Sequence, residues 1–154
     1  ELLVVTQYPE IMEEAENLGV KTVFSPESYK GASWTVKKAL EASAGMDACV
    51  FFVADQPYLS EETAEEFLGH MEKFGEEGLG CVCYGERTGN PVWFAQKYFS
   101  ELLELEGDSG GKKVLKKHWD EAVFFQISNE QELEDVDIWN GKLDQNGEIN
   151  SLQL

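Results

Sequence analysis

The most constraining feature of this 154-residue chain is an unbroken run of seven apolar residues, Ala48–Ala54, which is followed directly by Asp55. Such a run, without alternating polar residues, is typical of a strand that is covered on both faces. Pro57 cannot continue a central strand, so the strand is expected to end close to Asp55. The sequence therefore predicts a buried strand over residues 48–57 that delivers an acidic side chain to the edge of an α/β sheet.

The segments before this run alternate between strand and helix patterns. Short strands are predicted at 2–5 and 20–24, and helices at 10–18, 33–43 and 60–74. Ser33 is expected to cap the second of these helices. A β-α-β-α-β-α order implies a mainly parallel sheet with helices on both faces. We therefore predict an α/β fold, a three-layer α/β/α, Rossmann-like arrangement, as one domain over residues 1–154.

The second half of the chain is less regular. Strands are predicted at 80–84, 91–95 and 122–127, with a last short strand at 133–138. The first two are joined by a turn-rich segment, which suggests a hairpin. Short helices are expected at 98–105 and 112–119.

The charge of the chain is strongly acidic, with 30 acidic against 12 basic residues and a net charge of -18. Such a surface repels polyanions, so a nucleic-acid partner is not expected. No apolar stretch reaches the roughly 18 residues that a membrane span needs, so no membrane association is expected. Three cysteines in apolar runs indicate reduced thiols in a cytoplasmic protein. A small anionic ligand carried with a divalent cation is compatible with this charge.

Asp55 lies where open α/β sheets bind their ligands, beyond the carboxyl end of a strand. A carboxylate there suits Mg²⁺, which takes one or two acids together with substrate phosphates. The alternative is that Asp55 only caps the following turn or helix. The residues themselves leave both interpretations open.

Three further segments carry candidate groups. Gly107 and Asp108 belong to a glycine-rich loop that lets the backbone approach a ligand closely, and the basic run that begins at Lys112 follows it. Asn90 precedes Pro91, which restricts it to extended geometry. Each segment is equally compatible with an ordinary surface loop, turn or solvated helix face.

Asp135 and Asp137 are two residues apart, so in a strand they would share one face. Two acids on one face repel each other unless they share a cation or face solvent. The pair is therefore a candidate metal site or an exposed acidic edge.

In this order the segments resemble the MobA-like nucleotidyltransferases, and most closely the molybdenum cofactor cytidylyltransferase (MocA-type) branch. The similarity covers nearly the whole chain. It rests on Val4-Val5-Thr6, Gly31-Ala32-Ser33 with Lys38-Ala39-Leu40, Ala54-Asp55-Gln56-Pro57, Gly89-Asn90-Pro91-Val92-Trp93-Phe94, Gly107-Asp108-Ser109-Gly110-Gly111-Lys112 and Leu133-Glu134-Asp135-Val136-Asp137.

The resemblance implies a nucleotide-diphospho-sugar transferase fold and a role for each candidate. Asp55 would bind the Mg²⁺ that bridges the nucleotide phosphates, with Asp135 or Asp137 completing the metal shell. Gly31 and Ser33 would lie near the nucleotide. The acceptor side would be lined by a further set, Asn90, Pro91, Gly107, Asp108 and Lys112.

The implied reaction is attack by a phosphate oxygen of a molybdopterin-type cofactor on the α-phosphate of CTP or GTP, releasing pyrophosphate. Catalysis of this kind depends on positioning and charge neutralisation. A molybdoenzyme is the protein partner that this reaction suggests. A sugar-phosphate nucleotidyltransferase and a non-catalytic binding or delivery protein are the alternatives.

Two departures from the family pattern stand out. Relatives open with a strand and a glycine-rich loop whose arginine and lysine grip the triphosphate. This chain begins where relatives begin their second strand, so about 50 family residues are expected before it, within usual domain sizes. Relatives also follow the paired acids with Thr-Pro-Glu-Asp, whereas this chain has Ile138-Trp139-Asn140-Gly141.

Overall fold

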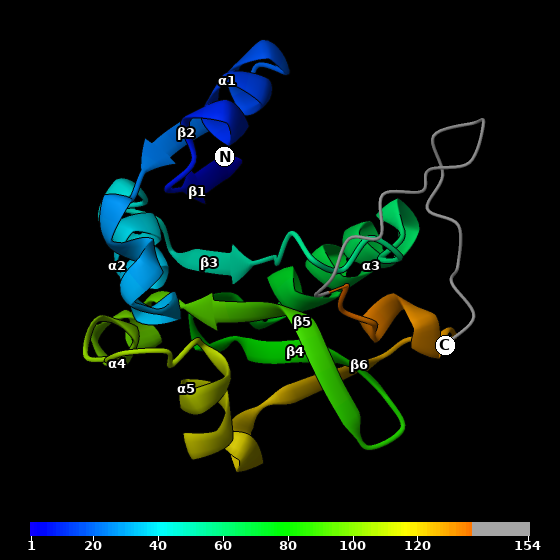
Figure 1. Ribbon diagram of the computed structural model, residues 1–154. Coiled ribbons are helices and arrows are strands. Elements are labelled where there is room, and N and C mark those ends of the chain that lie inside the picture. Colours follow the sequence, from blue (N-terminus) through cyan, green and yellow to red (C-terminus); the bar gives the residue numbers. More distant parts are fainter. Residues whose placement is uncertain (137–154) are drawn as a thin grey trace, which may run out of the picture.

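The apolar run forms strand β3 (Ala48–Phe51), which lies near the middle of the fold. A computed structural model describes residues 1–136 and shows a mixed α/β arrangement (Figure 1). The strand is shorter than predicted, because Phe52 and Val53 leave the sheet and are 44% and 39% exposed. The four residues of β3 are themselves half-buried rather than buried.

The first half of the chain follows the predicted alternation. It consists of β1 (Leu3–Thr6), α1 (Pro9–Asn17), β2 (Lys21–Phe24), the 3-10 helix η1 (Pro26–Lys30), α2 (Ala32–Ala42), β3 and α3 (Glu61–Met71). Gly19, with φ 75°, follows the C-cap of the first helix, a position where glycine is favoured because it adopts positive φ without strain. Ser60 caps α3, because its hydroxyl oxygen accepts a hydrogen bond of 3.1 Å from the amide of Thr63.

The second half begins with the 3-10 helix η2 (Glu72–Glu77) and a long hairpin. The remaining elements are β4 (Leu79–Tyr84), β5 (Arg87–Ala95), η3 (Gln96–Tyr98), α4 (Phe99–Leu103), α5 (Lys112–Lys117), η4 (Trp119–Glu121), β6 (Val123–Gln126) and η5 (Glu130–Leu133). The last short strand predicted at 133–138 is wrong for its described part. A 3-10 helix ends at Leu133, and residues 134–136 have no regular structure.

Within the described residues the strands form two sheets. A four-stranded sheet has the order β3-β5-β4-β6, and β1 and β2 form a parallel pair of their own. β5 runs antiparallel to both β3 and β4, whereas β4 and β6 are parallel. Three of the four strands therefore point the same way, which confirms a mainly parallel sheet with one reversed strand.

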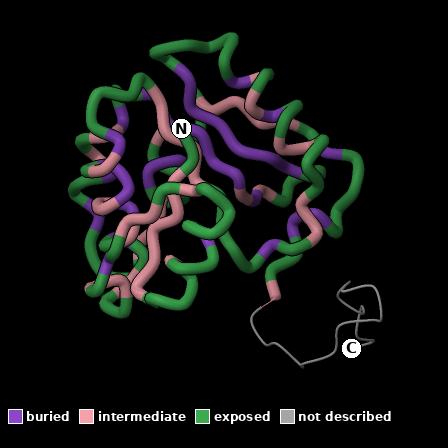
Figure 2. The backbone as a smooth tube through the Cα atoms, turned by 90° about the horizontal axis from the view of Figure 1, so that it is seen from above, coloured by how far each residue is buried: buried purple, intermediate pink, exposed green. Residues whose placement is uncertain are grey.

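Helices cover both faces of the four-stranded sheet, as the three-layer prediction requires. On one face, Val36 and Leu40 of α2 pack with Leu102 of α4 against strand residues such as Phe94. On the other face, Phe67 and Met71 of α3 pack against Val82 and Trp93. Figure 2 shows the continuous buried stretches of the chain that run through the centre of the molecule.

A groove of about 520 Å³ separates the two sheets. In Figure 1, β1 and β2 lie apart from β3, and the only strand that pairs with β3 within the described residues is β5. β1 pairs with β2 alone in the same part of the chain. The lining is mostly apolar and includes Leu3, Val5, Ala39, Cys49, Val50 and Phe51. This open side explains why β3 is only half-buried although its side chains pack into the cores of both faces.

The small sheet departs from one further expectation. Ile11 and Leu18 lie at helical spacing in the segment predicted as a helix at 10–18, but they are 48% and 76% exposed. Within the described residues α1 packs mainly on β1 and β2 and buries only Ala15, because this two-stranded sheet offers little surface to cover.

Candidate active site

Asp55 lies in the exposed turn that follows β3, beyond the end of the strand. Its side chain is exposed, whereas that of the next residue, Gln56, is only 7% exposed. The alternative that Asp55 caps the next helix is not supported, because Ser60 fills that position in α3. The Asp55 carboxylate is therefore presented to solvent at the edge of the sheet.

The segment carrying Asp135 reaches the same edge. The amide of Val136 donates a hydrogen bond of 2.7 Å to the carbonyl oxygen of Asp55. Leu133 packs on the hairpin, where a Cβ added at Gly89 would lie 2.6 Å from its Cδ2. The structure thus brings together two of the predicted acidic residues, Asp55 and Asp135. The third, Asp137, lies outside the described residues.

A second junction joins the segments of Gly31 and Asp108. The amide and the hydroxyl of Ser33 both donate to the carbonyl oxygen of Gly107, at 3.3 and 2.7 Å. The Oδ1 of Asp108 accepts a hydrogen bond of 3.3 Å from the amide of Ala32. The prediction that Ser33 caps the helix is wrong, because Gly31 is the N-cap and the Asp108 carboxylate meets the first helical amide.

Gly31 allows this close approach. A Cβ at this position would lie 2.3 Å from the carbonyl oxygen of Gly107, and its φ of 129° is one that other residues rarely adopt. Backbone contact with Gly107 therefore explains why position 31 is a glycine. The prediction that this junction contacts nucleotide or acceptor stays a prediction.

Asn90 and Pro91 both lie inside β5, which agrees with the strand predicted from Pro91 onwards. It corrects the expectation that Asn90 belongs to the turn-rich segment before that strand. Asn90 is half-buried, Pro91 is buried, and the peptide bond between them is cis. The extended geometry predicted for Asn90 is confirmed by its place in the strand. Lys112 is exposed at the first position of α5.

The fit of a divalent cation to these residues depends on the number of carboxylates. Residues 1–136 contain no group of three or more His, Cys, Asp or Glu side chains arranged to hold a metal. Asp55 and Asp135 supply two exposed carboxylates from adjoining segments. This number suits Mg²⁺, which is commonly held by one or two carboxylates and completed by waters and substrate phosphates.

Sequence reasoning overlooked Gln56 and Glu132, both of which are buried beside the acidic pair. Glu132 is 5% exposed, and its Oε2 accepts hydrogen bonds from the amide and hydroxyl of Ser60 at 3.1 and 3.0 Å. The buried Oε1 of Gln56 has no hydrogen-bond partner among the described residues. The sequence held only one signal for either residue, namely the position of Gln56 next to Asp55.

Arg87 is the only arginine of the chain, and its guanidinium is engaged within the fold. Its Nη2 donates a hydrogen bond of 2.9 Å to the carbonyl oxygen of Leu133, and its Nη1 lies 3.5 Å from Oε1 of Glu130. The group holds η5 against the hairpin, which places the Asp135 segment.

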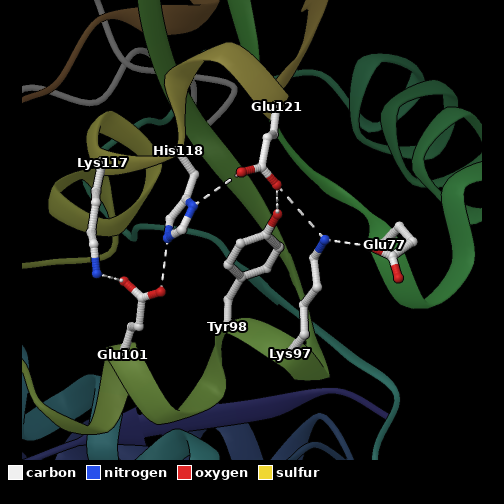
Figure 3. Close-up of polar contacts among 7 residues, drawn as sticks. All are labelled: Glu77, Lys97, Tyr98, Glu101, Lys117, His118 and Glu121. Atoms are coloured by element: carbon white, nitrogen blue, oxygen red, sulfur yellow. Dashed lines mark hydrogen bonds and ion pairs between the residues drawn. The ribbon is translucent and has the colours of Figure 1, made fainter.

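A separate polar network joins α4, α5 and η4 (Figure 3). Within it, Glu101 lies 2.8 Å from Nε2 of His118 and 2.7 Å from Nζ of Lys117. These partners, with the lysine named first, lower the pKa of Glu101. The other contacts of the network pair Glu121 with Tyr98, His118 and Lys97, and Lys97 with Glu77. Each charge drawn there is paired, which indicates a structural role.

A comparison with protein families matches residues 1–123 to the MobA-like NTP transferase domain. The chain belongs to this family. Membership makes it a nucleotidyltransferase and confirms the family resemblance drawn from its motifs. A search of curated proteins finds no match.

Several solved structures share the fold of this chain. A nucleotidyl transferase from Methanothermobacter thermautotrophicus aligns with a TM-score of 0.73 and 21% identity, over 89% of this chain and 67% of that one. Rv0371c from Mycobacterium tuberculosis aligns with a TM-score of 0.67 and 19% identity, over 82% of this chain and 65% of that one. A structure of Rv0371c in complex with manganese aligns with a TM-score of 0.61 and 20% identity, over 90% of this chain and 72% of that one.

The chain thus spans about two thirds of the length of the first two solved structures. At these identities the likeness concerns the fold. Within residues 1–136, no helix combines the length and the apolar character needed to cross a bilayer.

Proposed function

We propose that this MobA-like domain transfers CMP or GMP from CTP or GTP to the phosphate of a molybdopterin-type cofactor and releases pyrophosphate. The observation that carries this proposal is the contact between the Asp55 and Asp135 segments at the edge of the sheet, where Val136 donates to Asp55. A pair of carboxylates there supports a nucleotide site of the family type. A molybdoenzyme that receives the product and a cytoplasmic location belong to the same proposal.

The Mg²⁺ ion would be held by Asp55 and Asp135, with Asp137 as a third candidate outside the described residues. A bound divalent cation neutralises phosphate charge in reactions of this class. The manganese complex of Rv0371c supports a divalent ion for this fold. The ion also offsets the repulsion that a net charge of -18 exerts on a triphosphate.

The junction of Gly31 and Ser33 with Gly107 and Asp108 is proposed to position the two substrates. Its hydrogen bonds fix the start of α2 against the glycine-rich loop. A fixed junction reduces the motion of groups that must align for in-line transfer. Asn90 and Pro91 of β5 and Lys112 of α5 complete the proposed acceptor side.

The groove between β1 and β3 bears on the phosphate-binding loop that the family pattern predicts. We propose that in the active enzyme one further strand fills the groove and carries this loop. It would pair with the edges of β1 and β3 that face the groove and have no partner strand within residues 1–136. The apolar lining from β1, α2 and β3 supports a strand with aliphatic side chains on both faces. Hydrogen exchange tests this part: the β3 amides that do not pair with β5 should exchange as slowly as those of β4, and fast exchange in the active enzyme would contradict it.

Pyrophosphate release from CTP and from GTP, with a molybdopterin acceptor and Mg²⁺, tests the catalytic proposal. The Asp55→Asn variant should lower kcat/KM by about 100-fold or more, because the substitution removes a metal-binding charge. The matched control is Asp120→Asn, since Asp120 is an exposed acid of η4, away from the contact between the Asp55 and Asp135 segments.

The outcomes separate the alternatives. Turnover only with sugar phosphates as acceptors would favour a sugar-phosphate nucleotidyltransferase. Cofactor binding without pyrophosphate release would favour a binding or delivery protein. Equal kcat/KM for the Asp55→Asn and Asp120→Asn variants would contradict the assigned role of Asp55.

A further inference from the structure

Glu132 is the one charged residue among the buried side chains of the described chain, with 5% exposure. A buried carboxylate destabilises a fold unless hydrogen bonds or opposite charges replace its hydration. Here the replacement comes from a single residue, because both the amide and the hydroxyl of Ser60 donate to Oε2 of Glu132. Because Glu132 is buried, its charge cannot serve to keep the surface soluble, so it is expected to have another role.

The partner of Glu132 is itself a helix cap. The hydroxyl of Ser60 accepts from the amide of Thr63 while it donates to Glu132, so the carboxylate lies at the positive end of α3. The loop between β3 and α3 therefore ends at Ser60, which is hydrogen-bonded to Glu132. That loop carries Asp55.

Glu132 also precedes Asp135 in the sequence by one short turn. Between them, Leu133 is 2% exposed and its carbonyl oxygen accepts from Arg87, which fixes η5 on the hairpin side. Glu132 fixes η5 on the α3 side, and Val136 then donates to the Asp55 carbonyl oxygen. Two connections, one through the Glu132 side chain and one through the backbone, thus join the two acidic segments.

We infer that Glu132 is a positioning residue, which holds Asp55 and Asp135 close enough to share one divalent cation by clamping the start of α3 to η5. This inference rests on the proposed function, since it assigns Glu132 to the metal site proposed there. Glu132 need not touch the ion, because it acts through Ser60 and through the Asp135 segment. Groups that orient metal ligands without touching the ion typically change metal affinity by about 10–100-fold.

Mn²⁺ binding, measured by electron paramagnetic resonance on the full chain with CTP, tests the inference. Glu132→Ala should raise the Mn²⁺ Kd by about 10–100-fold. Glu132→Gln keeps a carbonyl oxygen that can accept from Ser60, so it should recover most of the affinity and stay within about 5-fold of the unmodified chain. The matched control is Glu134→Ala, an exposed acid two residues further along whose side chain forms no hydrogen bond or ion pair within residues 1–136.

Circular dichroism at the assay temperature separates positioning from folding. A merely structural role would lower the folded fraction and leave the Kd of the folded fraction unchanged, which would overturn the inference. If Glu132→Ala does not fold, Ser60→Ala decides, because it removes one of the two donors and should raise the Kd by about 3–10-fold. An unchanged Kd in Ser60→Ala would overturn the inference as well.

The proposed function fails differently. If the unmodified chain binds no Mn²⁺ with any nucleotide, the metal site itself is wrong, and the role of Glu132 falls with it. If Asp55→Asn abolishes Mn²⁺ binding while Glu132→Ala binds like the unmodified chain, the metal site stands and only the inference about Glu132 is wrong.

Discussion

The amide of Val136 donates a hydrogen bond of 2.7 Å to the carbonyl oxygen of Asp55. Through this bond the last described residue is fixed to the turn that follows β3. The consequence is that Asp135 and Asp55, distant in sequence, share one edge of the sheet.

Gly31→Ala should destabilise the fold by about 3 kcal/mol or more. The new Cβ would lie 2.3 Å from the carbonyl oxygen of Gly107, and the backbone φ of 129° would be strained for alanine. Urea unfolding followed by circular dichroism measures the change. The control is Gly69→Ala in α3, where a Cβ meets nothing within 4 Å. It should be neutral or stabilising by up to about 1 kcal/mol, because alanine favours a helix.

Ser33→Ala should cost about 1 kcal/mol of unfolding free energy. The hydroxyl is buried and donates to the Gly107 carbonyl oxygen at 2.7 Å, but that oxygen keeps its bond from the Ser33 amide. The same urea titration measures this, with the exposed Ser100→Ala as the control that stays within about 0.5 kcal/mol. A loss as small as that of the control would show that the hydroxyl does not stabilise the junction.

Glu101 should make the stability of the fold depend on pH. Hydrogen bonds from Lys117 and His118 lower its pKa from the ordinary 4.5, so the ionised form favours the folded state. This contribution is complete above pH 4.5 and disappears as the pH falls through the lowered pKa.

The Glu101→Gln variant tests this pH dependence. It should be less stable than the unmodified chain at pH 7, and the difference should shrink below pH 4.5. Thermal unfolding at a series of pH values measures it, with the exposed Glu106→Gln as the control. A gap between the two proteins that is constant over this range would contradict the role given to Glu101.

The cysteines should be unreactive in the folded protein. Cys81 and Cys83 are 0% and 1% exposed, and burial raises the pKa of Cys81 to about 12 and that of Cys49 to about 11. Because the thiolate is the reactive form, a thiol reagent at pH 8 should label the chain slowly until denaturant is added. Labelling followed by mass spectrometry measures the rate. Rapid labelling of Cys81 without denaturant would contradict the packing of β4.

Much of the fold could be predicted from local patterns. The continuous apolar run at Ala48 and the helical spacing of Val36 and Leu40 identified a strand and a helix that the structure contains. The spacing of apolar residues within a segment favours one type of secondary structure, and this spacing is local in the sequence. The motif order around Asp55 also led to the family, which the match over residues 1–123 confirms.

The errors fall where local patterns compete with distant contacts. Leu133 was expected to begin a strand, but its carbonyl oxygen binds Arg87 and its side chain packs on Gly89, and the chain there forms a 3-10 helix. Ser33 was expected to cap α2, but Asp108 from another segment meets that helix end. The secondary-structure propensity of a segment gives no information about a contact residue that lies far away in the sequence.

The sequence by itself determined the α/β class, the alternation of the first three strands and helices, and the acidic residue beyond β3, because these depend on periodicity and on proline and glycine. Only the tertiary structure decided that β5 lies between β3 and β4 and that Asp55 adjoins Asp135. It also placed Glu132 in the interior and left a groove between β1 and β3. Each of these depends on hydrogen bonds and packing between segments far apart in the chain, and no local pattern encodes such contacts.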